Sequence, residues 1–142
     1  MNYNEKAEEI FETVTKRKKY IDKVPSNISQ GESGVLLYLL NSNNNVSQSD
    51  LSEKLDVSIA RIVAIINTLQ KKELIEKKID ANDKRKTIIS ITEAGKEIIT
   101  QRKKQAIQFI ENVIKELDEK EIEQYIAINK KIEEISNKIK GW

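Results

Sequence analysis

The side chains best suited to chemistry in this sequence are cations that gather in its central part. Between Ser58 and Lys86, eight Lys or Arg residues stand against four Asp or Glu residues, whereas the whole chain has a net charge of only +2. A local excess of positive charge attracts the phosphate groups of nucleic acids. The segment therefore indicates nucleic-acid binding, and a solvated Lys-rich surface is the alternative that charge alone leaves open.

Catalytic chemistry has little support in the sequence. The chain contains no Cys and no His, which removes disulfides, thiolate metal sites, thiol redox sensing and the usual general base near neutral pH. Phosphate-binding glycine motifs and the G-x-S-x-G nucleophile motif are also missing from the sequence. We therefore expect no enzyme activity, no metal site and no cofactor.

Two short helices are predicted at the start of the basic segment. Residues 47–50 read as a capped helix start that leads into Leu51 and Leu55, and Asp56 then ends this helix. Ser58 caps a second helix, whose apolar residues Ile62, Ile65, Ile66 and Leu69 form one stripe. The pair reads as a helix-turn-helix, although a plain structural hairpin of helices remains an alternative. The face opposite the stripe is small and polar, a composition that suits a DNA major groove, and it carries Ala60, Arg61, Ala64, Asn67, Thr68 and Lys71.

A hairpin with a basic tip follows the second helix. Residues 74–79 and 87–91 are rich in Ile and read as two short strands, while residues 80–86 between them contain Lys84, Arg85 and Lys86. A helix-turn-helix followed by a two-stranded ribbon is the plan of a winged helix. This combination is much more specific than either part alone.

Long amphipathic helices are predicted on both sides of the winged helix. One covers residues 4–23, and others run from Thr92 to about Leu117 and from Asp118 to about Ile139. A shorter helix begins with a capping box at residues 29–32 and contains Leu36, Leu37, Leu39 and Leu40. The long helices exceed what a small core needs, so we expect them to join two subunits, with an intramolecular bundle as the alternative.

Length and composition indicate one folded domain over residues 1–142. The chain has 142 residues, 38% hydrophobic and 34% charged residues, 4 Gly and 1 Pro, which is typical of helix-rich proteins. The sequence has no apolar run near the roughly 18 residues of a membrane span, and the first five residues lack the apolar core of a signal peptide. We expect a mainly α-helical cytoplasmic protein with a small β-hairpin and no membrane partner.

The ordered motifs resemble those of the multiple-antibiotic-resistance regulator (MarR) family of bacterial winged-helix transcription factors. The resemblance covers nearly the whole chain and is most specific at residues 51–58, 69–75, 80–85 and 91–96. It implies a winged helix-turn-helix at about 29–91 and dimerisation helices at about 4–24 and 93–140. It also implies a homodimeric, ligand-responsive repressor that binds a pseudo-palindromic operator in double-stranded DNA.

The resemblance also implies roles for individual residues. Arg85 is similar to the wing arginine that enters the minor groove, and Asp83 to the carboxylate that orients it; Lys84 and Lys86 would neutralise phosphates. Further DNA contacts are expected at the starts of the two helices, from Ser47, Gln48, Ser58 and Arg61. A pocket for a small aromatic effector is expected by analogy near Phe11, Tyr20 or Tyr38.

The sequence departs from the family pattern at several positions. Ala60, Val63 and Ala64 stand where many relatives carry Ser, Thr or Arg, which leaves Arg61 as the main long polar reader. Glu73 replaces the usual Gly, so the helix exit must avoid a left-handed backbone or accept its cost. The alternative function is therefore a winged-helix protein-interaction adaptor or an architectural protein with weak, non-specific DNA binding.

Overall fold

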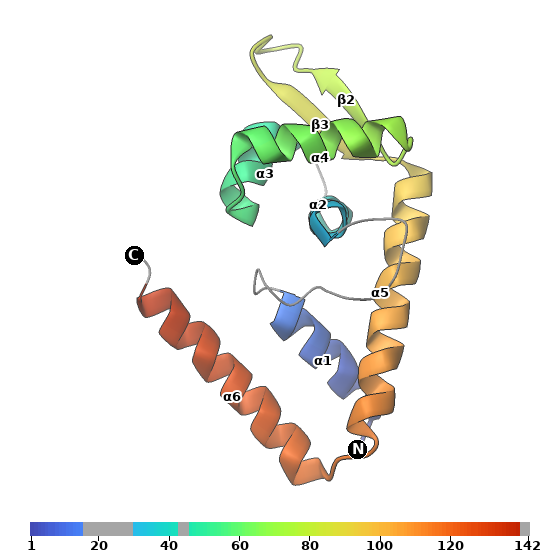
Figure 1. Cartoon of the computed structure of the whole chain (residues 1–142), viewed down its shortest axis with the longest axis vertical. Helices are drawn as coiled ribbons and strands as arrows, with labels where there is room; N and C mark the ends of the chain where they lie inside the picture. The colour runs from blue at the N-terminus through green and yellow to red at the C-terminus, as the bar shows by residue number, and fades with distance from the viewer. Residues whose placement is uncertain (16–29, 43–45, 140–142) are drawn as a thin grey trace. The chain divides into compact units, whose positions relative to one another are not determined.

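The computed structural model describes residues 1–15, 30–42 and 46–139. Its elements in chain order are α1 (Tyr3–Thr15), α2 (Gln30–Asn41), β1 (Val46–Ser47), α3 (Gln48–Leu55), α4 (Ile59–Lys71), β2 (Ile75–Ile79), β3 (Thr87–Ile91), α5 (Glu93–Ile114) and α6 (Glu119–Lys138) (Figure 1). They form two compact units, residues 22–101 and residues 1–21 with 102–142.

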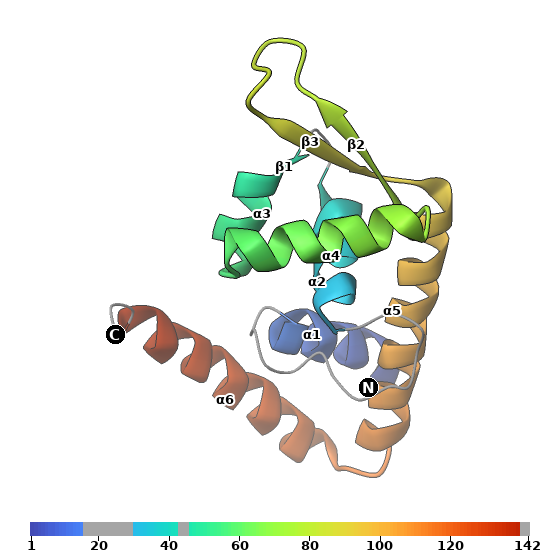
Figure 2. The same ribbon diagram turned by 45° about the horizontal axis from the view of Figure 1, so that its top comes forward.

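A small antiparallel sheet lies beside the helices of the unit formed by residues 22–101. Its strands are ordered β1-β3-β2, with Ile89 of β3 opposite Val46 on one side and Lys77 on the other. Figure 2 shows α4 running past the base of the β2–β3 hairpin, whose tip extends beyond the helix. The core between sheet and helices is aliphatic and includes Val35, Leu36, Leu39, Val46, Leu51, Ile62, Ile66, Leu69, Leu74, Ile75, Ile89 and Ile99.

Local polar contacts fix where α3 and α4 begin and end. The Ser47 and Asp50 side chains each accept a hydrogen bond from the backbone N–H of the other residue, at 3.0 and 3.1 Å, which forms the expected capping box. Asp56 then takes a left-handed conformation with φ 51° and ends α3. The Ser58 hydroxyl accepts from the Arg61 N–H at 3.2 Å and starts α4. These contacts set the angle between the two helices.

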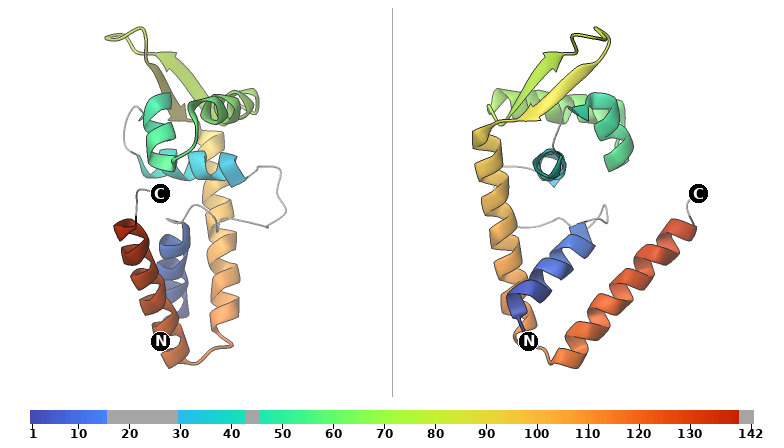
Figure 3. Two further views of the ribbon diagram at one scale, coloured as in Figure 1. Left: turned by 60° about the vertical axis from the view of Figure 1, so that its left-hand side comes forward. Right: turned by 180° about the vertical axis from the view of Figure 1, so that it is seen from behind.

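Helices α1 and α6, with the end of α5, build the other unit. Its buried hydrophobic cluster consists of Ala7, Ile10, Ile114, Ile122 and Ile126, and α1 packs against α6 (Figure 3). The exposed rim of this contact carries ion pairs between Lys6 and Glu123 and between Lys130 and Glu9, both at 3.0 Å. Asp118 and Glu121 form a capping box at the start of α6.

The expected fold class, mainly helical with a winged helix-turn-helix, is confirmed. The sheet has a third strand, β1, that the sequence analysis did not include, and α5 ends at Ile114, three residues before the expected Leu117. The predicted first helix is observed to Thr15. Its remainder, together with Tyr20 and Ser29 of the second capping box, lies outside the described residues.

Candidate nucleic-acid interface

Helix α4 has one buried face and one exposed face. Ile62, Ile66 and Leu69 are completely buried, because they recur at three- and four-residue spacing and point into the core. The opposite face exposes all the residues that the helical pattern assigned to it, namely Ala60, Arg61, Ala64, Asn67, Thr68 and Lys71. The structure therefore brings these predicted site residues together on one open helix surface.

The residues at the two helix starts differ in their exposure. Ser58 is exposed, and Gln48 is half-buried. Ser47, by contrast, is 7% exposed, and its hydroxyl serves the capping box with Asp50. Its burial and its place in the capping box set Ser47 apart from the exposed residues at the helix starts, and a DNA contact from Ser47 stays a prediction.

The capping box also acts on the Asp50 carboxyl group. The hydrogen bonds from the Ser47 backbone and side chain hold the pKa of Asp50 below its usual value, because they stabilise the ionised form. The negative charge sits at the start of α3, where the helix dipole also favours it. The start of the first helix of the helix-turn-helix is thus held by an ionised carboxylate.

The wing presents one arginine held by one aspartate. Asp83 Oδ1 accepts from the Arg85 backbone N–H at 3.0 Å and from Arg85 Nε at 3.3 Å. The hairpin tip is closed by the Lys86 N–H bonded to Asp83 O and the Asp80 N–H bonded to Lys86 O, both at 3.0 Å. The Arg85 side chain is nevertheless 93% exposed, and Lys84 and Lys86 are exposed beside it. The tip therefore offers three cations on a backbone fixed by local hydrogen bonds.

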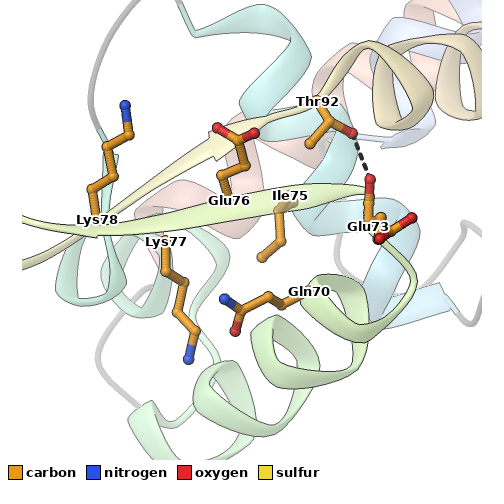
Figure 4. Close-up of a pocket in the computed structure, with 7 residues that line it drawn as sticks. All are labelled: Gln70, Glu73, Ile75, Glu76, Lys77, Lys78 and Thr92. Atoms are coloured by element: carbon orange, nitrogen blue, oxygen red, sulfur yellow. Dashed lines mark hydrogen bonds between the residues drawn. The ribbon is translucent and has the colours of Figure 1, made fainter.

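The wing joins the rest of the unit through a clasp at its base, formed by Glu73, Leu74 and Thr92. The Thr92 hydroxyl donates to the Glu73 carbonyl oxygen at 2.8 Å, and the Thr92 N–H donates to Leu74 O at 3.1 Å (Figure 4). Thr92 also caps α5, because its hydroxyl accepts from the Gly95 N–H at 3.0 Å. Glu73 takes φ 61°, so the helix exit accepts the left-handed conformation that the sequence raised as one of two possibilities.

A contact that the sequence analysis missed connects the wing to α4. Lys77 Nζ donates to Asn67 Oδ1 at 2.7 Å. Figure 4 shows Ile75 and Lys77 directed toward Gln70 and α4, while Glu76 and Lys78 point to the other side of the strand. The alternation of side chains along a strand was the available signal, but only the tertiary packing of β2 beside α4 identifies Asn67 as the partner.

A surface hollow of about 600 Å³ lies beside this contact, and Figure 4 shows the residues that line it. Its lining includes neither Phe11 nor Tyr38. Phe11 is buried in the unit of residues 1–21 and 102–142, with Lys103 Nζ 5.7 Å from its ring centre, and Tyr38 is half-buried against the core of the unit of residues 22–101. Tyr20 lies outside the described residues, so the effector site stays a prediction.

The described residues offer neither a metal-binding cluster nor a membrane-spanning helix. Within residues 1–15, 30–42 and 46–139, no group of three or more acidic, His or Cys side chains is placed to hold a metal ion. In the same part of the chain, no helix is long and apolar enough to cross a membrane.

Comparison with known proteins gives consistent matches. The model of the MarR family matches residues 32–87. An uncharacterised HTH-type transcriptional regulator of Bacillus subtilis, YdgJ, is 29% identical over 79 residues, which span 56% of this chain and about half of that protein, 48%. Among solved structures, MepR, described as a transcription regulator of the Staphylococcus aureus multidrug efflux pump MepA, is 21% identical with a TM-score of 0.65 over 92% of this chain and 87% of that one.

A second structure of S. aureus MepR, in complex with DNA, has a TM-score of 0.63 at 20% identity, covering 89% of this chain and 88% of that one. At this level of identity, the structural likeness establishes the fold alone.

Proposed function

We propose that the chain, whose residues 32–87 match the model of the MarR family, is a DNA-binding transcriptional regulator of that family and not an enzyme. The observation that carries the proposal is the pairing of an exposed helix face on α4 with a hairpin whose tip exposes Lys84, Arg85 and Lys86. An α-helix fits the major groove of B-DNA, and a basic wing can then reach the neighbouring backbone or minor groove. The DNA complex of MepR supports this proposal.

The wing arginine has a specific task in this proposal. Arg85 enters the minor groove, where a narrow groove has enhanced negative potential and presents acceptors to the guanidinium fork. Asp83, which accepts from the Arg85 backbone and Nε, orients the arginine before DNA arrives. Lys84 and Lys86 neutralise phosphates on either side, and Lys71 does so from the end of α4.

The protein acts as a homodimer on a pseudo-palindromic operator in this proposal. The unit formed by residues 1–21 and 102–142 exposes many large apolar side chains: Met1, Phe109, Val113, Leu117, Tyr125, Ile128, Ile132, Ile135 and Ile139. Such a surface favours burial against a second copy of the chain. Two recognition helices then reach half-sites about one helical turn apart, roughly 34–36 Å.

The proposed regulation is repression that a small aromatic effector relieves, in a cytoplasmic protein without a cofactor. The support for this part is the match of residues 32–87 to the MarR family model and the presence of the aromatic residues Phe11, Tyr20 and Tyr38 in the sequence. Effector binding that favours a conformation unable to span two half-sites would lower operator affinity.

The test is fluorescence-anisotropy binding to DNA from upstream of its own gene and to a scrambled duplex of equal length, across a salt series. A DNA-binding regulator binds the upstream duplex more tightly, and the logarithm of its affinity falls linearly with the logarithm of salt concentration, with a slope near −0.9 per phosphate contacted. Equal weak binding to both duplexes would favour the architectural alternative. No salt-dependent binding to either would favour the protein-interaction adaptor.

A further inference from the structure

The exposed face of α4 begins with a contiguous group of apolar side chains. Ile59 is 48% exposed, Ala60 and Ala64 are exposed and Val63 is half-buried. Residues three and four positions apart are neighbours on a helix surface, so these four side chains form one continuous surface, which we call the apolar patch. A solvent-facing apolar surface at the start of a recognition helix calls for a ligand with apolar groups.

The polar side chains around the patch already have hydrogen bonds within the protein. The Thr68 hydroxyl donates to Ala64 O at 3.0 Å, and the Ser58 hydroxyl accepts from the Arg61 backbone N–H at 3.2 Å. Asn67 Oδ1 accepts from Lys77 at 2.7 Å. Fewer of their donors and acceptors are therefore left for base edges, which gives the apolar patch a larger share in the contact with bases.

Only one base offers an apolar group in the major groove of DNA. Thymine carries a 5-methyl group there, whereas adenine, guanine and cytosine present hydrogen-bond donors and acceptors. Small side chains such as Ala60 and Ala64 let the helix backbone approach the bases closely. Ile59 and Val63 then supply branched surfaces that can cover a methyl group and remove it from water.

We propose that the apolar patch of α4 reads thymine through its 5-methyl group, so that the preferred half-site has A·T pairs under the first turns of α4. This inference rests on the proposed function. The charge around the patch selects DNA over an apolar protein segment as its occupant, because Arg61 and Lys71 lie on the same helix face and the wing adds Lys84, Arg85 and Lys86. DNA matches both the apolar patch and the surrounding positive charge, because it is a polyanion that carries thymine methyl groups in the groove between its two phosphate strands.

The experiment first selects tight-binding duplexes from a random pool with the full-length protein. Thymine is then replaced by deoxyuridine, which lacks the methyl group but keeps the base-pairing edge, first at all positions and then singly. We expect each contacted methyl to contribute about fourfold in affinity, the factor that corresponds to about 0.8 kcal/mol for a buried CH₂-sized group. Ile59→Ala lowers affinity for the thymine duplex and reduces the loss that deoxyuridine causes.

A matched control separates the helix from the wing. Arg85→Ala lowers affinity for both the thymine and the deoxyuridine duplex and leaves the ratio of the two affinities unchanged. The 5-methyl group faces the major groove, whereas the wing arginine enters the minor groove in the proposed function. Tight, sequence-preferring binding that is equal for thymine and deoxyuridine duplexes would overturn the inference while leaving the proposed function standing. Selection that recovers no preferred sequence would overturn the proposed function and this inference with it.

Discussion

Arg85 combines full exposure with a fixed starting position. Its side chain is 93% exposed, yet Asp83 holds both its backbone and its Nε, so less conformational entropy is lost when it enters a groove. Arg85→Ala should therefore lower operator affinity by about 1–3 kcal/mol, the range of a specific arginine contact. Anisotropy titrations measure the change.

The neighbouring Lys84 gives the matched control for Arg85. Lys84→Ala removes a phosphate contact, so it should weaken operator and scrambled duplexes by the same factor and reduce the salt slope by about one. An unchanged dissociation constant for Arg85→Ala in a folded protein would contradict the wing assignment.

Gly95 lies near the start of α5, where the helix passes very close to the backbone at Leu74. A Cβ at Gly95 would overlap the carbonyl oxygen of Leu74 and lie 2.8 Å from Cγ1 of Ile91. Gly95→Ala should lower the free energy of unfolding by more than about 2 kcal/mol, since backbone must shift in a packed region. Gly34 in α2 has no atom within 4 Å of such a Cβ, so Gly34→Ala should instead stabilise by about 0.4–1 kcal/mol. Denaturant unfolding compares them, and equal effects would refute the close approach at Gly95.

At the residue scale, the sequence predicted the contacts that are local in the chain. The caps at Ser47 and Ser58 join residues three positions apart, so their spacing reveals them, whereas the role of Asp83 beside Arg85 was expected from the family resemblance. The Lys77–Asn67 bond and the Lys72–Glu32 ion pair, at 2.9 Å, join different elements. Their partners depend on how a strand and two helices pack, which residue spacing does not contain.

The exit of α4 is an element boundary with a measurable conformational cost. Glu73 has φ 61°, a conformation that costs a residue with a Cβ roughly 1–2 kcal/mol and costs Gly almost nothing. Glu73→Gly should stabilise the protein by about 0.5–1 kcal/mol, because part of the gain is offset by the greater freedom of Gly in the unfolded chain. Glu73→Ala keeps the cost and serves as the control. Thermal and denaturant unfolding measure the change in stability, and a Glu73→Gly variant that is less stable than the parent protein would contradict the prediction.

The start of α3 should make stability depend on pH. The pKa of Asp50 is held below its usual value of 3.8, so its contribution is fully present above that value and is lost as pH falls through the folded-state pKa. Asp50→Asn keeps a side-chain acceptor but does not titrate. Between pH 6 and pH 2, the free energy of unfolding of the parent protein should therefore fall more steeply than that of Asp50→Asn, and parallel curves would contradict this.

Hydrophobic periodicity and capping residues located the described helices well. For the first helix, the prediction could be compared with the structure only as far as Thr15. The strand β1 was missed because Val46 and Ser47 also read as the approach to a capped helix. Its pairing with Ile88 and Ile89 of β3 is a tertiary event. Two residues are too few for the alternating pattern that identifies a strand.

At the scale of the whole molecule, α6 carries the proposed subunit contact. Tyr125, Ile128, Ile132, Ile135 and Ile139 recur at three- and four-residue spacing and are 42–56% exposed, which is the pattern of a helix that buries a stripe against a partner. Ile128→Glu should weaken dimerisation, because it places a charge in an apolar interface. Ala127→Glu makes the same charge change at an exposed neighbouring position on another side of α6 and should leave the dimer intact. Sedimentation equilibrium distinguishes them, and a dimer of unchanged affinity in Ile128→Glu would exclude this stripe as the contact.

The sequence also indicated nucleic-acid binding from the place of its positive charge. Without Cys or His, the chain offers few routes to catalysis, and its positive excess falls on the segment that the structure resolves into α4 and the wing. The sequence did not show which polar residues are exposed, because Ser47 is polar and yet buried. Burial follows from the packing of several elements at once.

The clasp of Glu73, Leu74 and Thr92 makes the position of α4 independent of the tip of the wing. Its hydrogen bonds close the hairpin at its base, so the position of α4 does not depend on the length of the loop at residues 80–86. Exposed loop tips with both ends fixed accept insertions and deletions more readily than other segments. This loop can thus be lengthened, shortened or exchanged while the rest of the fold keeps its sequence.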